Sequence, residues 1–386
     1  MLKIKEKLKN YSDKSLLRTR RVIAKRHQGE IEISGLVCVN FASNDYLGLA
    51  QHPDIKQAFI KGVTDYGFGS SASPLVSGFY QPQKELEEKW AEFLNRESAI
   101  FFNSGYLANL GVISTLASRD TIVISDKLCH ASLLDGIQLS RALHYRFPHQ
   151  DLFKLESMLR DACKPALVVT ESVFSMEGAI SPIKQIAAMT KDKGILVVDD
   201  AHGIGILGDS GAGICEHDKL SVKEVPVLIT PLGKAMGGMG AMVSGSKELI
   251  ETILQFSRHY RYSTALPPAV AMANLTALKL LKQETYRLEK LQILIKFFVN
   301  ACIERMLPLV SSDLTPIKSI PVLSNDRALS IQQGLMNQGF YVAVMRPPTV
   351  PLGQICLRIS LNSNLEENHI LKMLDALARL YVRHSK

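Results

Sequence analysis

The sequence predicts an α/β protein with an N-terminal helical arm, a large domain whose mostly parallel sheet is flanked by helices, and a small C-terminal α+β domain. Short apolar runs that alternate with helical patterns between residues 99 and 244 predict the sheet. A change of character after about residue 257 predicts the second domain. With 386 residues, the chain is also too long for one small core. The expected parts are the arm with a short hairpin, the large domain, and a linking helix with the small domain, at 1–45, 46–265 and 266–386.

The expected sheet rests on six apolar runs that lack the alternation of a half-exposed strand. Ile195 to Val198 is an unbroken apolar run of this kind. Such runs suit strands that are buried on both faces, as in a parallel sheet covered by helices. Helices are expected over 83–94 and from about residue 107. The strands are expected at 99–102, 121–125, 166–169, 195–198, 227–229 and 240–244.

The two ends of the chain carry other patterns. An amphipathic helix over residues 2–28 is expected first, followed by a hairpin with strands 30–33 and 36–41. After Pro267-Pro268, residues 269–305 have the pattern of one long helix. The last part is expected to hold strands at 320–323, 341–344 and 355–360, and helices at 328–338 and 365–383.

Composition indicates an ordinary globular protein, with 46% hydrophobic and 21% charged residues. No apolar run reaches the roughly 18 residues that span a bilayer, and the first residues lack the apolar core of a signal peptide. The six cysteines are scattered without a C-x-x-C pair, which favours reduced thiols over a disulfide or zinc framework. We therefore expect a cytoplasmic protein without a metal site and without a membrane partner.

The net charge of +8 is concentrated at the N-terminus. Residues 1–26 hold ten Lys and Arg against two acidic residues, so the remaining 360 residues balance. A nucleic-acid-binding face spread over the fold is therefore not expected. The arm is either a solvated helix or a segment that meets a phosphate-bearing or acidic partner through its charge.

A lysine and an aspartate each follow an apolar strand, and together they predict a ligand site. Lys234 follows the strand 227–229 and precedes the glycine-rich run 237–240. A lysine amine can react with an aldehyde, and glycines let a bulky group lie near the backbone. Asp199 ends the strand 195–198, where open α/β sheets place their ligands. Each alone has a common structural explanation as a turn residue, but the pair predicts a site for pyridoxal phosphate (PLP), whose ring nitrogen a carboxylate keeps protonated.

Three further features fit this site. The segment 103–106 joins an expected strand to an expected helix, which is the arrangement of a phosphate cradle. His130 is placed to stack its imidazole on a flat ring, although a lone histidine is more often structural. In the last part of the chain, Arg346 or Arg358 could hold a carboxylate with two hydrogen bonds.

Two other motifs carry little weight. Residues 203–208 match G-x-G-x-x-G after a strand, but no amphipathic helix follows, so a dinucleotide site is not expected. Residues 208–211 are similar to a serine protease nucleophile loop, but the surrounding sequence is α/β and indicates no oxyanion site.

With these motifs, the chain resembles the α-oxoamine synthases over nearly its whole length. These are PLP enzymes of aminotransferase fold type I, so the resemblance implies the PLP-dependent transferase fold type I and a decarboxylative condensation of an amino acid with an acyl thioester. The loop Arg346-Pro347-Pro348-Thr349-Val350-Pro351 most resembles the biotin-pathway branch. That branch implies L-alanine and either pimeloyl-CoA or pimeloyl-acyl carrier protein as substrates. A glycine-using relative, such as a glycine C-acetyltransferase, and a non-catalytic scaffold are the alternatives.

The resemblance implies four catalytic residues. Lys234 would bind the cofactor aldehyde and later act as a base. Asp199 would pair with the pyridine nitrogen, and His202 would bond the ring oxygen. His130 would stack on the ring and contact the substrate. The resemblance also implies a homodimer with active sites at the subunit interface, and residues 67–78 are candidates to reach the partner.

The remaining expected site residues surround the phosphate and the substrate. Pro231 stands where the family usually has a threonine that bonds the phosphate. Either Thr230 reaches the phosphate through a shifted loop, or one hydrogen bond is missing. Gln83 stands where relatives often have histidine. The expected phosphate residues are Gly105, Tyr106, Ser175 and Thr230, and the expected substrate residues are Arg18, Asn44, Thr349 and Arg358.

Overall fold

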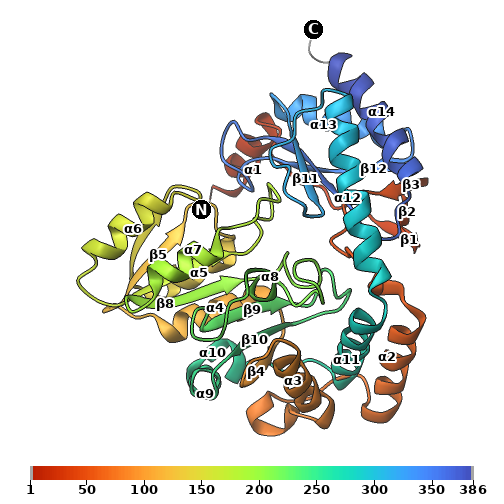
Figure 1. Ribbon diagram of the computed structural model, residues 1–386. Coiled ribbons are helices and arrows are strands. Elements are labelled where there is room, and N and C mark those ends of the chain that lie inside the picture. Colours follow the sequence, from red (N-terminus) through yellow and green to blue (C-terminus); the bar gives the residue numbers. More distant parts are fainter. Residues whose placement is uncertain (1–2, 384–386) are drawn as a thin grey trace. The chain divides into compact units, whose positions relative to one another are not determined.

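The computed structural model describes residues 3–383 and divides the chain into two compact units (Figure 1). The larger unit comprises 49–175 and 180–288. The terminal unit comprises 1–48, 176–179 and 289–386. The chain termini thus share one unit, whereas the division expected above, at 1–45, 46–265 and 266–386, stays a prediction about domains.

A seven-stranded sheet forms the centre of the larger unit, in the order β4-β10-β9-β8-β7-β5-β6. Only the ladders of β10 with β4 and β9 are antiparallel, which confirms the expected mostly parallel sheet. β6 was not expected, because it is an exposed edge strand without an apolar run. The strands are β4 (Ser98–Phe102), β5 (Ile122–Asp126), β6 (Leu143–Phe147), β7 (Ala166–Glu171), β8 (Gly194–Asp199), β9 (Val227–Pro231) and β10 (Ala241–Gly245).

Helices cover both faces of this sheet (Figure 1). On one face lie α4 (Gly105–Leu116), α5 (Ala131–Ser140), α9 (Lys247–Phe256) and α10 (Arg258–Arg261). The other helical segments are η1 (Leu49–Gln51), α2 (Pro53–Tyr66), η2 (Pro74–Gly78), α3 (Gln81–Phe93), α6 (Leu152–Asp161), α7 (Ile183–Thr190), α8 (Ile214–Asp218) and α11 (Pro268–Gln283). Of these, α3 packs on β4 and β10, and α7 packs on β8.

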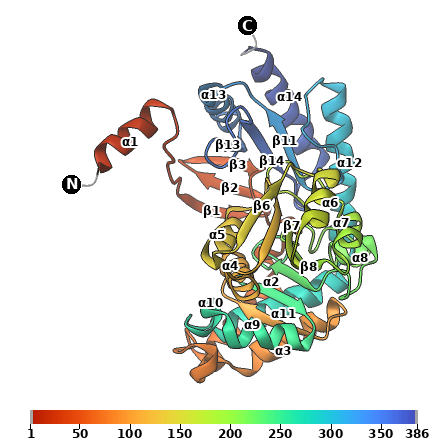
Figure 2. The ribbon, with the colours of Figure 1, turned by 90° about the vertical axis from the view of Figure 1, so that its left-hand side faces the viewer.

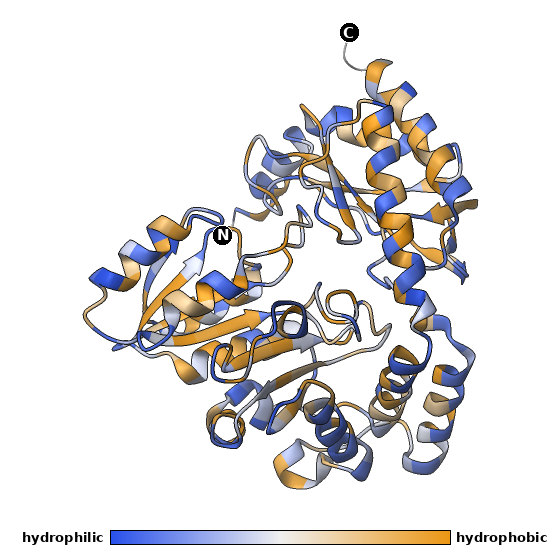
Figure 3. Ribbon diagram, in the orientation of Figure 1, coloured by the Kyte–Doolittle hydropathy of each residue, from blue (hydrophilic) through white to orange (hydrophobic). Residues whose placement is uncertain are grey.

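The core of the larger unit lies between the sheet and the helices α4, α5, α9 and α10. Phe102, Val197 and Ile229 come from the sheet, and Val112 comes from α4. The hydropathy colouring shows the same segregation, with apolar strands at the centre (Figure 3). Burying each such side chain stabilises the fold by about 1.5–3 kcal/mol, so this sheet is a rigid base for the residues at its edge.

The terminal unit holds two smaller sheets, in the orders β1-β2-β3-β12 and β11-β14-β13. The expected hairpin is confirmed, because Ser34 and Gly35 have the positive φ of a tight turn between β2 and β3. The strands are β1 (Ile23–His27), β2 (Glu30–Ile33), β3 (Leu36–Asn40), β11 (Ile317–Pro321), β12 (Phe340–Tyr341), β13 (Ala343–Met345) and β14 (Cys356–Ser360). The helices are α1 (Ile4–Asp13), α13 (Asn325–Met336), α14 (Glu367–Arg383) and α12 (Tyr286–Glu304), which begins in the larger unit.

The expected single helix over residues 2–28 is wrong. Within the described residues, α1 ends at Asp13, and Ser15 then adopts a φ of 52°, which no helix tolerates. The chain continues into β1, which pairs with β2. Since none of the described α1 residues is buried, no packing extends the helix, and α1 stands apart from the small sheet (Figure 2).

The expected long helix over 269–305 is two helices, α11 and α12. Glu284 breaks it with a ψ of 53°. The Glu284 carboxylate accepts a hydrogen bond from Arg287 Nε at 2.5 Å and from the Tyr286 hydroxyl at 3.1 Å. An acidic side chain at the start of a helix is stabilised by the helix dipole, so the carboxylate favours a new start here.

Residues 3–383 contain no helix that combines the length and the apolar character needed to cross a bilayer.

Candidate active site

Neighbouring parallel strands of the larger unit end in polar side chains at one edge of the sheet. Glu171 is the last residue of β7, Asp199 is the last residue of β8, and Lys234 follows β9 by three positions. The strand register aligns Glu171 with Asp199. Open α/β sheets bind their ligands at this edge. The structure therefore brings the two residues of the expected site, Asp199 and Lys234, to the same place.

Two hydrogen bonds hold the Asp199 carboxylate in one orientation. Its Oδ2 accepts from Asn109 Nδ2 at 2.7 Å, and its Oδ1 accepts from the backbone N–H of Ala201 at 3.0 Å. The side chain is buried, and hydrogen bonds to a carboxylate are stronger than those between neutral groups. A fixed carboxylate at a strand end is what a protonated ring nitrogen needs as a partner.

Lys234 lies beside His202, with 2.9 Å between Lys234 Nζ and His202 Nε2. His202 is buried in the turn that follows Asp199, so one turn supplies both side chains. The glycine-rich run after Lys234 passes close to other backbone. Gly237 has a φ of 63°, and a Cβ there would lie 2.4 Å from the backbone nitrogen of Ala50. Only glycine fits this position.

His130 caps the N-terminus of α5 and joins the same edge of the sheet. Its backbone N–H donates to Glu171 Oε1 at 2.6 Å, and its Nδ1 lies 2.7 Å from Ser132 Oγ. Burial and the Lys234 ammonium group lower the pKa of His130, against the pull of Asp199. These effects favour the neutral imidazole, which stacks on a cationic ring without repulsion.

Glu171 is a site residue that the sequence analysis missed. Burial and the neighbouring Asp199 raise the pKa of Glu171 to about 8. Glu171 is 3% exposed, and its carboxyl accepts a hydrogen bond from the His130 backbone N–H. It therefore fixes the backbone position of the histidine. The available signal was a charged residue at the end of an otherwise apolar strand, the same signal that pointed to Asp199.

The segment expected to cradle the phosphate lies at the N-terminus of α4. The Ser104 side chain caps the helix by accepting from the Leu107 N–H at 3.2 Å. The first N–H groups of a helix lack intrahelical acceptors and attract anions. A Cβ on Gly105 would lie 2.6 Å from Pro231 Cγ, so the helix approaches the end of β9 where only glycine fits. Tyr106 follows, and its hydroxyl bonds the Asp135 carboxylate.

Helix α4 links the two ends of the expected ring site. Gly105 stands at its phosphate end, and Asn109 contacts Asp199 at its ring end. Four residues of α-helix advance about 6 Å, which suits a flat ring that carries a phosphate on one side. The donor set and the glycine at the helix start therefore fit PLP.

The Thr230 hydroxyl is engaged away from the N-terminus of α4, and its expected contact with the phosphate stays a prediction. Its hydroxyl accepts from Trp90 Nε1 at 2.9 Å and donates to the Met242 carbonyl at 3.3 Å. Successive strand residues face opposite sides of a sheet, so Thr230 faces α3 whereas Pro231 faces α4. Pro231 packs against Gly105 at the start of α4.

Ser175 follows β7 by four positions and is half-buried. Its expected place near the phosphate stays a prediction.

The terminal unit holds a second polar cluster around Arg358. This guanidinium is buried and donates to Asn44 Oδ1 at 3.2 Å and to Ser360 Oγ at 3.0 Å. The Tyr46 hydroxyl also donates to Asn44 Oδ1, at 3.2 Å. The structure thus brings the expected pair Asn44 and Arg358 together. A guanidinium that is buried among neutral oxygens is well suited to receive a carboxylate.

Arg346, the other arginine considered for a carboxylate, is engaged in contacts with the N-terminal segment. The buried Arg346 guanidinium donates to the backbone carbonyls of Ser15 and Leu17, the latter at 3.2 Å. In return, Arg18 Nη2 donates to the carbonyls of Arg346 at 3.0 Å and Pro347 at 3.1 Å. We call this reciprocal pair the arginine clasp.

Thr349 lies exposed in the loop that the clasp holds, and its N–H donates to the Arg346 carbonyl at 3.0 Å. The clasp therefore brings Arg18 and the Thr349 loop together within the terminal unit. Their expected contacts with substrate stay predictions.

Gln83 has a structural role in the larger unit. Its Nε2 donates to the carbonyls of Gly78 at 3.2 Å and Leu266 at 2.9 Å, and its Oε1 accepts from the Tyr80 N–H at 2.8 Å. The side chain is buried and ties the loop before α3 to the start of the segment before α11. Both the oxygen and the nitrogen of the Gln83 amide therefore form hydrogen bonds at this position.

The G-x-G-x-x-G segment 203–208 forms turns around the buried Asp200, and the next helix, α8, begins only at Ile214. A Cβ on Gly203 would lie 1.9 Å from Asp200 Oδ1. Gly203 thus serves close packing against Asp200.

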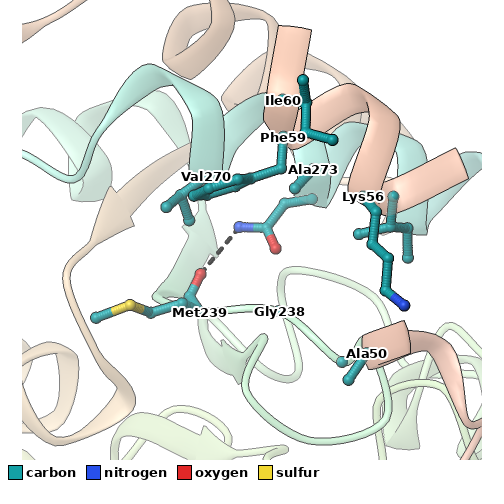
Figure 4. A pocket seen from close by; sticks show the side chains of 11 residues that line it. Ala50, Lys56, Phe59, Ile60, Gly238, Met239, Val270 and Ala273 are labelled. Carbon is teal, nitrogen blue, oxygen red and sulfur yellow. Dashed lines mark hydrogen bonds between the residues drawn. The ribbon is translucent and has the colours of Figure 1, made fainter. Parts of the chain in front are cut away.

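An apolar pocket of about 510 Å³ lies behind the glycine-rich run (Figure 4). Helices α2 and α11 line it with Ile60 and Val270, and Gly238 and Met239 close one side. Asn274 Nδ2 donates to the Met239 carbonyl at 2.9 Å and so fixes that side. Asp199, His202 and Lys234 do not line this pocket, so it is separate from the polar site.

Comparisons with known proteins agree with this geometry. Residues 37–377 match the family described as aminotransferase class I and II. The chain belongs to this family and, within it, to the 8-amino-7-oxononanoate synthases. One member, from Cellvibrio japonicus, is 43% identical over 94% of this chain and 92% of its own length. The expected aminotransferase fold type I is confirmed.

Two solved structures are similar to the chain. The 8-amino-7-oxononanoate synthase of Francisella tularensis is 36% identical, with a TM-score of 0.81 over 90% of this chain and 99% of that one. A serine palmitoyltransferase from S. paucimobilis, solved with bound PLP, is 26% identical, with a TM-score of 0.92 over 98% of this chain and 97% of that one.

Proposed function

We propose that the chain is a PLP-dependent acyltransferase that makes 8-amino-7-oxononanoate for biotin biosynthesis. L-Alanine and a pimeloyl thioester condense, and CO2 and the free thiol carrier are released. The observation that carries this proposal is the Lys234–His202 pair beside the fixed Asp199 carboxylate, in a chain that is 43% identical to synthases of this name. The free thiols of the described cysteines favour a cytoplasmic location.

PLP supplies an electron sink that stabilises negative charge at the substrate Cα when it is bound. Asp199 holds the proton on the ring nitrogen through its oriented oxygens. His202 Nε2 lies within 2.9 Å of Lys234 Nζ and orients that amine. Lys234 would hold the cofactor through its amine and, once alanine has displaced it, its Nζ would take the Cα proton of alanine and return a proton to the product. His130 covers the ring face, and the N-terminus of α4 with Gly105 and Tyr106 holds the phosphate, with Ser175 nearby.

Substrate recognition falls to the terminal unit. The buried Arg358, oriented by Asn44, binds the carboxylate of the amino acid. Arg18 and Thr349 contact the acyl substrate from the loop that the arginine clasp holds. The thiol carrier is either CoA or an acyl carrier protein, and the basic N-terminal arm suits the phosphates of the first or the acidic surface of the second.

The functional unit is a homodimer. The pocket behind the glycine-rich run and the apolar side chains of the loop 67–79 support this assembly, because a second copy would cover them. Phe68 is 93% exposed and Val76 is 79% exposed, and soluble monomers rarely leave such groups together in water. A mass of one chain by light scattering of the PLP-loaded protein would contradict the dimer.

Release of free thiol carrier tests the proposed reaction. The PLP-loaded protein is expected to release thiol with L-alanine plus pimeloyl-CoA and not with glycine plus acetyl-CoA. Lys234→Ala should fold and lose at least about a thousandfold in rate, since it removes both the covalent link and the base. Lys154→Ala, on the surface of α6, is the matched control and should keep full activity.

The other outcomes point to the alternatives. Turnover with glycine plus acetyl-CoA would identify a glycine C-acetyltransferase with the same fold and the same lysine. If the protein neither absorbs in the visible range with PLP nor releases thiol from either pair, it is a non-catalytic scaffold.

A further inference from the structure

Two buried polar side chains connect His130 to Asp199. Asn109 lies in the second turn of α4, and Ser132 lies in the first turn of α5. Both are 1% exposed. Asn109 Nδ2 is 2.7 Å from Asp199 Oδ2 and 2.8 Å from Ser132 Oγ, and Ser132 Oγ is 2.7 Å from His130 Nδ1. The four side chains form one continuous hydrogen-bond chain.

The carboxylate sets the direction of this chain. A carboxylate accepts hydrogen bonds, so the amide group that faces Asp199 must be the NH2 of Asn109. The same nitrogen donates its second hydrogen to Ser132 Oγ. Within the described residues, Asn109 Oδ1 is buried without a hydrogen-bond partner. An unsatisfied buried carbonyl costs free energy, which the two hydrogen bonds of the Asn109 nitrogen offset.

Ser132 links Asn109 to His130, and its hydrogen bonds determine which nitrogen of His130 carries the proton. Its Oγ accepts from Asn109 and keeps its hydroxyl proton available to donate to His130 Nδ1. The backbone N–H of Ser132 also points to this nitrogen, at 3.3 Å. Two donors that converge on Nδ1 require a lone pair there. The proton of a neutral His130 must then sit on Nε2.

We propose that Asn109 and Ser132 are positioning residues that hold His130 as the neutral tautomer with its proton on Nε2. His130 thereby offers an uncharged ring face to the cofactor and an N–H donor to the substrate, rather than a base. The charged groups that face it are Lys234, Asp199 and Asp135, and burial together with Lys234 disfavours the charged imidazole. The Asn109 amide orients Asp199 directly and His130 through Ser132. One residue therefore positions both side chains.

The inference rests on the proposed function for its meaning in catalysis, but its test does not require turnover. The protein is prepared with ¹⁵N-labelled histidine rings, loaded with PLP and recorded by two-bond ¹H–¹⁵N correlation. The His130 signal is assigned from its loss in His130→Asn. The expected spectrum shows an unprotonated Nδ1 and a protonated Nε2. A proton on Nδ1, or on both nitrogens near neutral pH, would overturn the proposal.

Variants separate positioning from packing. In Ser132→Ala the His130 signals should move toward a mixture of tautomers, and the rate of thiol release should fall on the order of tenfold with PLP still bound. Ser132→Thr keeps the hydroxyl and should restore the tautomer. Ser114→Ala, whose hydroxyl bonds only the Leu110 carbonyl of its own helix, is the matched control and should change neither.

The two hypotheses fail differently. The expected tautomer in a protein that releases no thiol would overturn the proposed function alone. Normal turnover with an unchanged tautomer in both Ser132→Ala and Asn109→Ala would overturn the positioning role alone. If Asn109→Ala does not fold, Ser132→Ala and Ser132→Thr still decide the question.

Discussion

Glu171 is a carboxyl group that the fold keeps protonated near neutral pH. Its unfolded carboxyl titrates near 4.5, whereas the folded pKa is about 8, raised first by burial and then by Asp199. Between these values the folded state binds the proton more tightly, so the free energy of unfolding falls as the pH rises. Glutamine matches the protonated form in shape and still accepts the His130 N–H.

We therefore expect Glu171→Gln to be close to the wild type near pH 5 and more stable by roughly 3–4 kcal/mol near pH 8. Urea unfolding of the PLP-loaded proteins at both pH values measures this difference. Glu171→Ala removes the acceptor of the His130 N–H and should be less stable at both. If the free energy of unfolding changes equally with pH in the wild type and in Glu171→Gln, Glu171 is ionised in the folded protein.

Among single residues, the sequence predicts the site residues at strand ends. It does not predict the residues that position other side chains. Lys234 and Asp199 are predictable because each follows an apolar run and the carboxyl ends of parallel strands meet at one edge. Asn109 and Ser132 look like ordinary helix residues, since their partners come from other elements. The side of the sheet that Thr230 faces is not evident from the sequence, because it depends on the register of β9.

At the scale of elements, the arginine clasp ties the N-terminal segment to the loop that carries Thr349. Replacing Arg346 by alanine removes two charge-assisted hydrogen bonds, to the carbonyls of Ser15 and Leu17. Each such bond contributes about 1.5–3 kcal/mol, so the segment should detach. We expect faster tryptic cleavage before residue 22 and a KM for the acyl thioester that rises on the order of tenfold, with a smaller change in kcat.

Arg160→Ala, on the exposed surface of α6, is the control for this change and should leave both readouts as in the wild type. Equal protease sensitivity of Arg346→Ala and the wild type would show that the clasp does not hold the segment. A lower kcat at unchanged KM would instead place Arg346 at the reacting atoms.

Most elements of the larger unit are predictable because buried parallel strands and amphipathic helices have distinct periods. The errors arise where tertiary pairing overrides local pattern. The N-terminal helix is shortened because residues 23–27 pair with β2, and the helix over 269–305 is split because Glu284 interacts with Arg287. β6 is missed because an exposed edge strand needs no apolar run.

At the scale of the whole molecule, the net positive charge is concentrated in one exposed segment at the N-terminus. The first 26 residues carry the entire net charge of +8, and none of the described residues of α1 is buried. A charged helix that packs on nothing is free to meet a charged partner. Such attraction acts over about 10 Å at 0.1 M salt and weakens as salt rises.

A basic arm suits either donor, and a charge variant tests whether the arm recognises the acidic carrier protein. Replacing Lys3, Lys5, Lys7 and Lys9 by glutamine removes four positive charges from α1 and its N-cap residue. We expect KM for pimeloyl-acyl carrier protein to rise on the order of tenfold at about 50 mM salt and to lose most of its salt dependence, because steering by the arm is gone. KM for pimeloyl-CoA should change less, since CoA presents far fewer charges.

The matched control replaces four exposed lysines of the larger unit, Lys154, Lys164, Lys193 and Lys223, by glutamine and should leave both KM values unchanged. If the two donors lose affinity equally in the α1 variant, the arm recognises the phosphates that both carry, and the carrier protein surface has no part in it.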